Sequence, residues 1–353
     1  MSLNGSEEMK RIFLLVIFLF LFAVFPGWHL KAGPKPEPSG LFPVKISGKW
    51  GFMDKSAKLL IPARFDEVND FSEGMAAVKL GGKWGFIDQS GTVVMEPKYD
   101  RAFDFHCGRA AIRSEGKYGY LDQTGKIIIA PRYYDAWGFS EGLANVKSEQ
   151  DGGWGYIDPA GKMLIREQFP EAKDFSEGLA AVRVKDDWGY IDRNFGETGK
   201  YAIPLNYDRA FNFQQGLALV RSKDQYQFGT IDKTGKYALA PARESVYQFS
   251  DGLAGVKVGD KYGYMDKTGK IVIQPQFDIA GEFSEGMAGV NIGGAFKGKW
   301  GFIDQTGKVI IPPQFDECKS FSQGLAQITL GAKIGYIDRD FAKTGKFVWE
   351  PTE

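Results

Sequence analysis

Apolar runs and turn-forming residues follow one another in a fixed order along most of this chain. In residues 74–97, GMAAVKLGGKWGFIDQSGTVVMEP, three runs rich in apolar and β-branched residues are separated by two turn signals. The Gly-Gly pair supplies the positive φ angles of a tight hairpin, and the Asp-Gln-Ser-Gly stretch forms the second turn. Large side chains at alternate positions, such as Trp84 and Phe86, belong on the buried face of a strand. The pattern predicts a three-stranded antiparallel meander that Pro97 ends.

The same unit recurs along the chain. Its mark is Trp-Gly, or another large apolar residue before Gly, and the pairs begin at Trp50, Trp84, Tyr118, Trp154, Trp188, Phe228, Tyr262, Trp300 and Ile334. Each pair leads to an Asp that we expect to cap the next turn: Asp54, Asp88, Asp122, Asp158, Asp192, Asp232, Asp266, Asp304 and Asp338. A second signature, Phe-Ser-Glu-Gly or a variant, occurs eight times, first at residues 71–74. A period of 34 to 40 residues predicts a solenoid, a propeller or another repeat array.

These signatures resemble those of the WG-repeat family, also called KWG repeats. The match is clearest in GKWGFIDQTGKVIIPPQFDE (residues 298–317) followed by FSQGLA (residues 321–326), and the resemblance extends over about residues 41–351. It implies a bacterial protein, often exported or associated with the envelope, of a family mostly without an assigned biochemical activity. Two departures are mild: Ile334 replaces Trp in the last unit, and Phe-His-Cys-Gly replaces Phe-Ser-Glu-Gly at residues 105–108.

The fold class is therefore all-β, with about nine three-stranded antiparallel meanders in tandem. Propeller blades usually have four strands and rings of four to eight blades, so nine shorter units favour an open β-solenoid or superhelix. A closed β-propeller is the alternative, because the connector at residues 98–103, KYDRAF, is long enough for a short fourth strand.

The N-terminal segment has the pattern of an export signal. Two basic residues precede an unbroken apolar run at residues 12–25, which is short for a membrane span. We predict an N-terminal hydrophobic helix that is either cleaved or kept as a membrane anchor. The chain then divides into residues 1–30 as signal or anchor, 31–40 as a Pro- and Gly-rich linker, and 41–353 as the repeat domain. The domain is expected on the periplasmic or extracellular side of the envelope, with the membrane touched only by the N-terminal segment.

Composition and charge narrow the classes of function. The 44 basic and 44 acidic residues balance, and this disfavours nucleic acid as a partner. Histidine is scarce, with only His29 and His106, and neither a zinc-type ligand spacing nor a calcium loop occurs, so we predict no metal, no cofactor and no catalytic residue. Cys107 and Cys318 are expected to be unpaired, buried packing residues.

The remaining candidates are residues for binding. Trp137 lies outside the repeat signature and is the best single candidate for an exposed aromatic anchor, whereas the signature aromatic residues are expected in the core. A series of acids, Glu73, Glu141, Glu177, Asp251 and Glu285, either lines one edge and attracts a cationic partner or simply caps turns and faces solvent. We predict a non-enzymatic scaffold that binds a protein or peptide at the cell envelope. The alternative is a module that binds cell-wall glycan through aromatic residues of the repeats.

Overall fold

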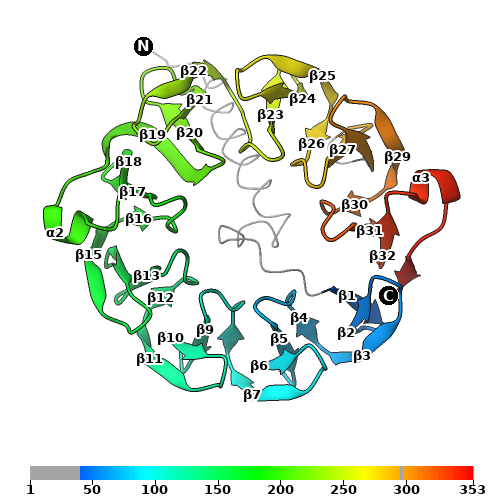
Figure 1. Cartoon of the computed structure of the whole chain (residues 1–353), viewed down its shortest axis with the longest axis horizontal. Helices are drawn as coiled ribbons and strands as arrows, with labels where there is room; N and C mark the ends of the chain where they lie inside the picture. Colours follow the sequence, from blue (N-terminus) through cyan, green and yellow to red (C-terminus); the bar gives the residue numbers. More distant parts are fainter. Residues whose placement is uncertain (1–39, 295–296, 353) are drawn as a thin grey trace, which may run out of the picture.

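The computed structural model describes residues 40–294 and 297–352, and these form a closed ring of nine β-sheet blades (Figure 1). The predicted signal at residues 1–30 and nearly all of the linker lie outside the described residues. Two short helices, α2 (Phe195–Thr198) and α3 (Phe341–Thr344), project from the ring. Neither described helix has the length and apolar character needed to cross a membrane.

A typical blade is a four-stranded antiparallel sheet that runs from the centre of the ring outwards. In blade 2 the order is β4 (Glu67–Val68), β5 (Met75–Leu80), β6 (Lys83–Asp88) and β7 (Val93–Tyr99). The inner strand is the connector between repeats, whose residues pair with β5. The prediction of three strands was therefore wrong by one, because two paired residues between two bends are too few to give a strand pattern in the sequence.

The other blades repeat this order with local changes. Blade 1 has β1 (Leu41–Ile46), β2 (Lys49–Asp54) and β3 (Leu59–Phe65); blade 3 has β8 (Arg101–Ala102), β9 (Arg109–Ser114), β10 (Lys117–Asp122) and β11 (Ile127–Tyr133); blade 4 has β12 (Asp135–Ala136), β13 (Ala144–Lys147), β14 (Trp154–Ile157) and β15 (Met163–Phe169). Blades 5 and 6 share the long β19 (Ile203–Gln214), which follows β16 (Glu171–Ala172), β17 (Ala180–Val184) and β18 (Asp187–Ile191) and precedes β20 (Leu217–Ser222), β21 (Phe228–Ile231) and β22 (Tyr237–Arg243).

The last three blades complete the ring. Blade 7 has β23 (Leu253–Val258), β24 (Lys261–Asp266) and β25 (Ile271–Phe277); blade 8 has β26 (Ile279–Ala280), β27 (Met287–Ile292), β28 (Lys299–Asp304) and β29 (Val309–Phe315); blade 9 has β30 (Glu317–Cys318), β31 (Leu325–Leu330), β32 (Lys333–Asp338) and β33 (Trp349–Thr352). In blade 7 the inner strand is reduced to a single bridge between Val246 and Val256.

The glycine of each Trp-Gly pair is required by the outer strand. Trp84 pairs with Tyr99 and Phe86 with Met95, so three residues of β7 bulge opposite Gly85 alone. A Cβ on Gly85 would lie 2.4 Å from the Met95 carbonyl oxygen and 2.7 Å from the nitrogen of Pro97. The proline therefore lies inside this bulge and does not end the strand as predicted, because a bulge tolerates a residue without an N–H group.

The hydrophobic core lies between neighbouring blades. Phe86 of blade 2 contacts Phe105 of the next repeat edge to face, with ring centroids 5.1 Å apart, and the same pairing recurs around the ring. The aromatic residues before the signature glycines belong to these layers: Tyr118, Trp188, Phe228 and Trp300 are buried, and Trp50, Trp84, Trp154, Tyr262 and Ile334 are half-buried. The repeats thus bury each other's apolar faces, as the pattern predicts for a repeat array.

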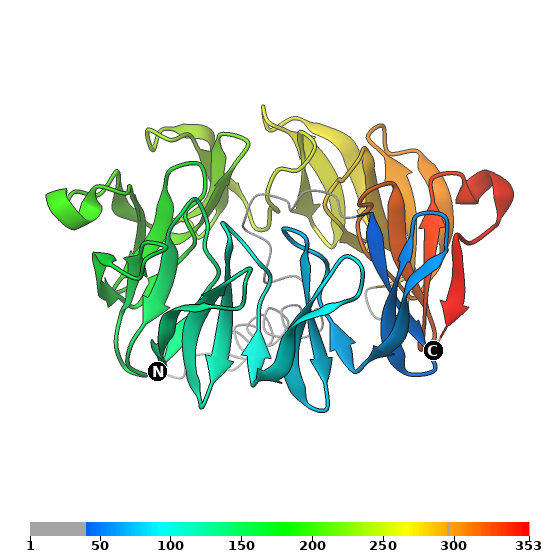
Figure 2. The ribbon, with the colours of Figure 1, turned by 60° about the horizontal axis from the view of Figure 1, so that its bottom comes forward.

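The first and last blades meet, so the ring is closed. The ring of Phe42 in blade 1 packs on Tyr336 of blade 9 at 5.8 Å, within a cluster that also holds Val44 and Leu325. Of the two arrangements left open by the sequence, the structure has the propeller and not the favoured open stack. The short inner strand supplies the fourth strand of a blade, and a small rotation per blade brings nine blades around to the start (Figure 2).

Two backbone carbonyls of β1 accept hydrogen bonds from blade 9. In other blades the equivalent carbonyls accept N–H groups of the inner strand or its flanking residues. Asn69 of blade 2, for example, donates its N–H to the Ala77 carbonyl. In blade 1 the equivalent carbonyl belongs to Pro43 and accepts the Tyr336 hydroxyl at 2.8 Å, while the Lys45 carbonyl accepts the Thr352 hydroxyl at 2.5 Å. The last blade therefore satisfies the inner edge of β1.

Candidate functional site

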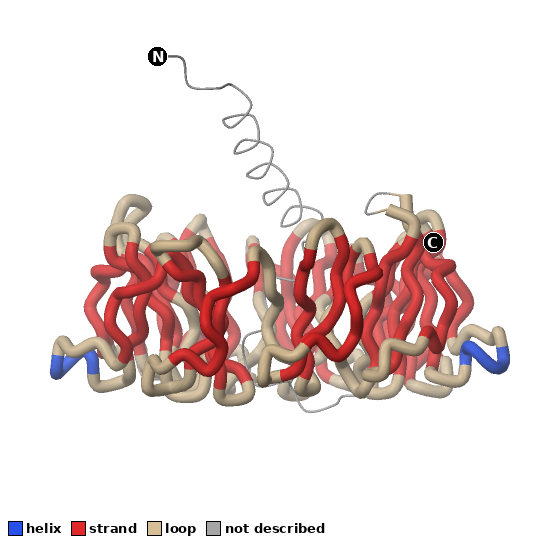
Figure 3. Tube along the Cα trace, turned by 90° about the horizontal axis from the view of Figure 1, so that it is seen from above, coloured by secondary structure: helices blue, strands red, loops and turns tan. Residues whose placement is uncertain are grey.

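One axial face of the ring carries the eight Phe-Ser-Glu-Gly-type segments, which we call FSEG turns. In the first, Ser72 and Met75 exchange two backbone hydrogen bonds, and Glu73 and Gly74 between them both have positive φ angles, 50° and 83°. The Asp-capped turns between the two outer strands lie on the same side, as do α2 and α3, which replace two of these turns (Figure 3). We call this side the turn face.

Carboxylates link successive FSEG turns across the seams between blades. Glu73 accepts the backbone N–H groups of Cys107 and Gly108, at 2.7 and 2.8 Å, and Glu141 accepts those of Glu177 and Gly178, at 2.7 and 2.9 Å. Equivalent bonds run from Gly216 to Glu177, from Gly286 to Asp251, from Gly324 to Glu285 and from Gly40 to the amide oxygen of Gln323. The last of these crosses the closure between blades 9 and 1.

The serine and tyrosine hydroxyls add a second set of links between blades. Ser140 donates to the Phe175 carbonyl at 2.7 Å, and the serines of four other FSEG turns make the same bond. Deeper in the seam the buried Tyr120 hydroxyl donates to the Trp137 carbonyl at 2.7 Å, and burial raises the pKa of Tyr120 well above its ordinary value. Most neighbouring blades are thus joined on the turn face by side-chain-to-backbone hydrogen bonds.

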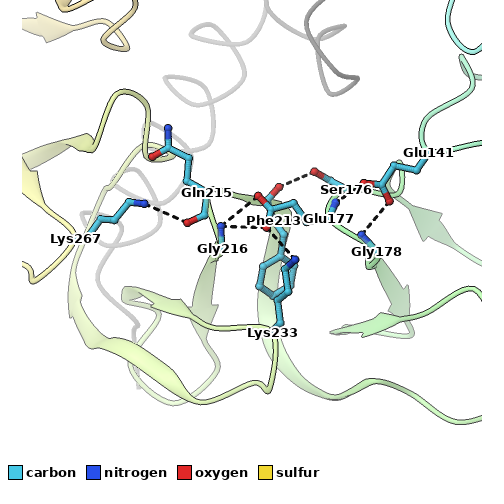
Figure 4. A network of polar contacts seen from close by, with 9 residues as sticks. All are labelled: Glu141, Ser176, Glu177, Gly178, Phe213, Gln215, Gly216, Lys233 and Lys267. Atoms are coloured by element: carbon cyan, nitrogen blue, oxygen red, sulfur yellow. Dashed lines mark hydrogen bonds and ion pairs between the residues drawn. The ribbon is translucent and has the colours of Figure 1, made fainter.

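In some seams, a cationic side chain of an Asp-capped turn contacts the FSEG turn of the preceding blade. The ammonium group of Lys233 lies 3.2 Å from Glu177 Oε2, which also accepts the Gly216 N–H, and Lys267 donates to the Gln215 carbonyl (Figure 4). Arg339 takes the corresponding place beside Glu285. A carboxylate in such a seam is therefore held by backbone N–H groups and a side-chain cation together.

These hydrogen bonds show where the predicted series of acidic residues lies in the structure. Glu73 is exposed and Glu141, Glu177 and Glu285 are half-buried, and all four reach toward the next FSEG turn. The series follows the turn face as an edge, but its carboxylates serve as intramolecular acceptors. Sequence reasoning located these residues and missed their partners, because the N–H groups lie about one repeat further along the chain.

The aspartates after the Trp-Gly pairs cap their own turns. Asp88 Oδ1 accepts the backbone N–H groups of Ser90 and Thr92, at 2.9 and 3.0 Å, and also the Ser90 hydroxyl. The hydroxyl contact, and then these N–H bonds, lower the pKa of Asp88. The same cap forms at Asp54, Asp122, Asp158, Asp232, Asp266 and Asp304, and a single N–H bond forms at Asp192 and Asp338.

Trp137, the predicted aromatic anchor, is half-buried next to the inner strand of blade 4. Its backbone N–H donates to the Asn145 carbonyl. Equivalent positions in other blades hold Phe103, Phe211 and Tyr247, which are also half-buried. Four blades therefore carry an aromatic residue at this repeat position, of which sequence reasoning identified one. Three of them pack on the signature aromatic residue of their own blade: Phe103 on Tyr118, Phe211 on Phe228 and Tyr247 on Tyr262.

Two residues differ from the expectations or were missed. Cys107 is exposed in its FSEG turn and only Cys318 approaches burial, so the expectation of two buried cysteines was wrong for Cys107. Burial raises the pKa of Asp174, in the inner segment of blade 5, to about 6, against the weaker attraction of Lys173. Within the described ranges no group of three or more His, Cys, Asp or Glu side chains has the geometry to hold a metal ion.

The rim of the ring carries a band of apolar side chains. In seven of the nine outermost strands at least one of the first two residues is a well-exposed apolar residue: Leu59, Leu60, Val94, Ile127, Met163, Leu164, Tyr237, Val272 and Val309. We call this set the rim band. Helix α2 packs on β15 so closely that a Cβ on Gly196 would lie 1.9 Å from the Leu164 carbonyl oxygen, and α3 contacts β29. The chain thus covers part of its own rim band in two blades.

Comparisons with known proteins agree with the repeat pattern. A family model described as WG containing repeat matches eight successive segments, residues 50–84, 84–118, 118–150, 154–187, 188–226, 228–262, 262–294 and 300–333. A search of curated proteins finds no match.

Several solved structures are similar to this chain at low sequence identity. The crystal structure of a eukaryotic initiation factor is 13% identical, with 89% of this chain and 95% of that chain covered and a TM-score of 0.61. Dihydro-heme d1 dehydrogenase NirN is 14% identical over 82% of this chain and 77% of its own, with a TM-score of 0.48, and Kluyveromyces lactis Hsv2 is 10% identical over 65% and 89%, with a TM-score of 0.43. The first of these likenesses concerns the fold alone, and the other two carry no argument.

Proposed function

Because the chain belongs to the WG-repeat family, whose repeats build its ring, we propose that it is a non-catalytic scaffold that binds a protein or peptide. The observation that carries the proposal is the rim band. Exposed apolar side chains at the start of the outermost strand recur in seven blades, and such a recurring apolar surface marks a place for contact. The packing of α2 and α3 against this band supports polypeptide as the occupant.

We place the scaffold at the cell envelope. The support is the N-terminal pattern of a basic pair followed by fourteen apolar residues, at 12–25, with a Pro- and Gly-rich spacer before the first blade. A rigid ring on such a spacer would be held away from the membrane surface and offer its whole rim to partners. Fractionation of cells that produce the full chain, against a form without residues 1–30, tests this: only the full chain should reach the envelope fraction.

Capture from envelope extract tests binding at the rim. The full chain is immobilised beside a variant in which Leu60, Val94 and Val272 are all changed to Glu. A control carries Lys117→Glu, Lys185→Glu and Lys333→Glu, at exposed positions of the hairpins opposite the turn face. We expect the wild type and the control to retain the same proteins and the rim variant to lose them. Equal retention by the rim variant would contradict the proposal.

A glycan ligand is the second candidate. It is supported by the half-buried Trp137, which is beside the inner strand of blade 4 and has no aromatic partner among the described residues, since aromatic faces stack on sugar rings. Sedimentation with purified peptidoglycan distinguishes the two. Binding that disappears in Trp137→Ala and persists in the rim variant would favour glycan over protein.

A further inference from the structure

The seam between blades 3 and 4 on the turn face differs from the other seams at several positions at once. In the FSEG turn of blade 3, His106 replaces Ser and Cys107 replaces the acid, and Arg109 follows where other repeats have Leu or Met. Across the seam, Gly138 stands where most repeats have an acidic or amide side chain, and Pro159 stands where Gln123, Lys267 and Gln305 donate hydrogen bonds. His106 and Gly138 are in contact, with 3.4 Å between the imidazole and the position of a Cβ on Gly138.

These changes leave a pair of backbone donors without their usual acceptor. In blades 3 and 5 the two residues with positive φ direct both N–H groups at the carboxylate of the preceding blade, as Cys107 and Gly108 do to Glu73. In blades 6, 8 and 9 the glycine alone donates to that carboxylate. The corresponding N–H groups in blade 4 belong to Glu141 and Gly142, whose φ angles are 51° and 76°. In the described part of the chain these two N–H groups have no hydrogen-bond acceptor, because the Cys107 side chain carries no carboxylate.

The cation of the site is still present. Where the seam between blades 5 and 6 has Lys233 at 3.2 Å from the carboxylate of Glu177, the seam between blades 3 and 4 has Pro159, and Arg109 extends to it with Nε 3.5 Å from the Pro159 carbonyl oxygen. Arg109 also donates from Nη1 to the Gly108 carbonyl, which leaves Nη2 without a hydrogen bond among the described residues. Relative to the seam between blades 5 and 6, this seam has Cys107 in place of Glu177 and Arg109 in place of Lys233, so the cation is kept and the acid is lost.

Two other FSEG turns lack an acid and have glutamine in its place, Gln215 in blade 6 and Gln323 in blade 9. A glutamine side chain has an oxygen of its own, and that of Gln323 accepts the Gly40 N–H at the ring closure. Cysteine offers no comparable acceptor. The seam between blades 3 and 4 thus keeps the two donors and the cation that hold a carboxylate elsewhere in this chain, and lacks only the carboxylate.

We propose that this seam binds a carboxylate from a partner polypeptide, held by the N–H groups of Glu141 and Gly142 and flanked by Arg109. Paired donors of charge-assisted hydrogen bonds beside a guanidinium suit the two oxygens of one carboxylate. The exposed Cys107 leaves the site open to solvent. The proposal deepens the proposed function, on which the partner's being a polypeptide rests, by naming the chemical group that the scaffold recognises.

The test compares Cys107→Glu with Cys107→Ser in the full chain. Four other repeats have Glu at this position with the same left-handed backbone, so the Glu variant is compatible with the fold. Its side chain should fill the site from within, and the unfolding midpoint should rise relative to Cys107→Ser. The Ser variant is too short to reach the donors and should keep the site open.

Binding is measured from the amide signals of Glu141 and Gly142 in ¹⁵N-labelled protein, in a nonionic detergent. Three probes separate the sources of the carboxylate: Gly-Gly-Glu-Gly-Gly with both ends blocked, pentaglycine with a free C-terminus, and pentaglycine with both ends blocked. We expect saturable shifts in wild type and Cys107→Ser with the first or the second probe, none with the third, and none with any probe in Cys107→Glu. Arg109→Gln should weaken binding about tenfold.

Three results would overturn the carboxylate site: no carboxylate-dependent shift in wild type, equal shifts in Cys107→Glu, or a Cys107→Glu midpoint no higher than that of Cys107→Ser. The proposed function is judged separately by the rim variant. Envelope proteins captured equally by wild type and Cys107→Glu would refute a role of this seam in their capture and leave the scaffold standing.

Discussion

Gly119→Ala should destabilise the ring strongly for a change of one methyl group. A Cβ on Gly119 would lie 2.5 Å from the Ile129 carbonyl oxygen, 2.6 Å from the nitrogen of Pro131 and 2.8 Å from its Cα. All three atoms belong to the backbone of β11, so no side-chain rotation relieves the overlap. An ordinary contact begins at 3.4 Å, and β11 must therefore retreat from β10 by about 0.9 Å.

The magnitude follows from three effects. Overpacking of this kind typically costs about 1–3 kcal/mol. Retreat of β11 also weakens its ladder with β10, at about 1 kcal/mol for each hydrogen bond lost. Loss of backbone freedom in the unfolded chain offsets about 0.4–1 kcal/mol. We expect the free energy of unfolding to fall by about 3 kcal/mol.

Urea unfolding followed by tryptophan fluorescence measures this change, with Gly138→Ala as the control. Gly138 lies about half a repeat further along the chain, and a Cβ there would meet only the His106 ring, at 3.4 Å. The control should change stability by less than about 1 kcal/mol. A Gly119→Ala protein as stable as the control would refute the reasoning that the outer strand dictates the glycine of the repeat signature.

Three further results are expected. Tyr120→Phe should lower the free energy of unfolding by about 1 kcal/mol, because the buried hydroxyl bonded to Trp137 is lost while the ring stays, as Phe86 does at the same repeat position; an unchanged urea midpoint would contradict this. Asp174 has its pKa raised to about 6 in the folded state, so its stabilising effect is complete below about pH 4 and is lost as the pH rises through 6; the stability of Asp174→Asn relative to wild type should therefore rise by at most about 3 kcal/mol from pH 4 to pH 7, and a flat difference would count against it. Tyr336→Phe combined with Thr352→Val should speed hydrogen exchange in β1 at least about tenfold, since two bonds across the closure are lost, and unchanged protection would speak against their role.

Local features of the fold were predictable because their causes lie within a few residues. Asp88 accepts N–H groups two and four residues ahead, and the Gly-Gly pair at 81–82 has φ angles of 60° and 82°, so both turns are visible in the sequence. Because the repeats have the same pattern, the sequence also predicted that the aromatic residues of neighbouring repeats pack against one another. These inferences need no knowledge of how many units complete the ring.

Closure and the site were beyond sequence reasoning because they depend on partners one or more repeats away. Whether an array closes depends on the rotation between blades, which is small for each pair and accumulates over nine. The replacement of Glu by Cys107 was visible as a departure, but its meaning depends on the N–H groups of Glu141 and Gly142 in the next blade. Pro43, which has no N–H to offer an inner strand, is the one sequence signal that marks β1 as an edge.

The closed ring is the central claim, and a distance between its first and last blades tests it most directly. Spin labels at Lys49 and Lys333 occupy equivalent exposed positions of blades 1 and 9, and labels at Lys83 and Lys117 occupy those of the adjacent blades 2 and 3. In a Cys107→Ser background, dipolar electron spin resonance should give the two pairs the same short distance. A 49–333 distance far longer than the 83–117 distance would contradict closure.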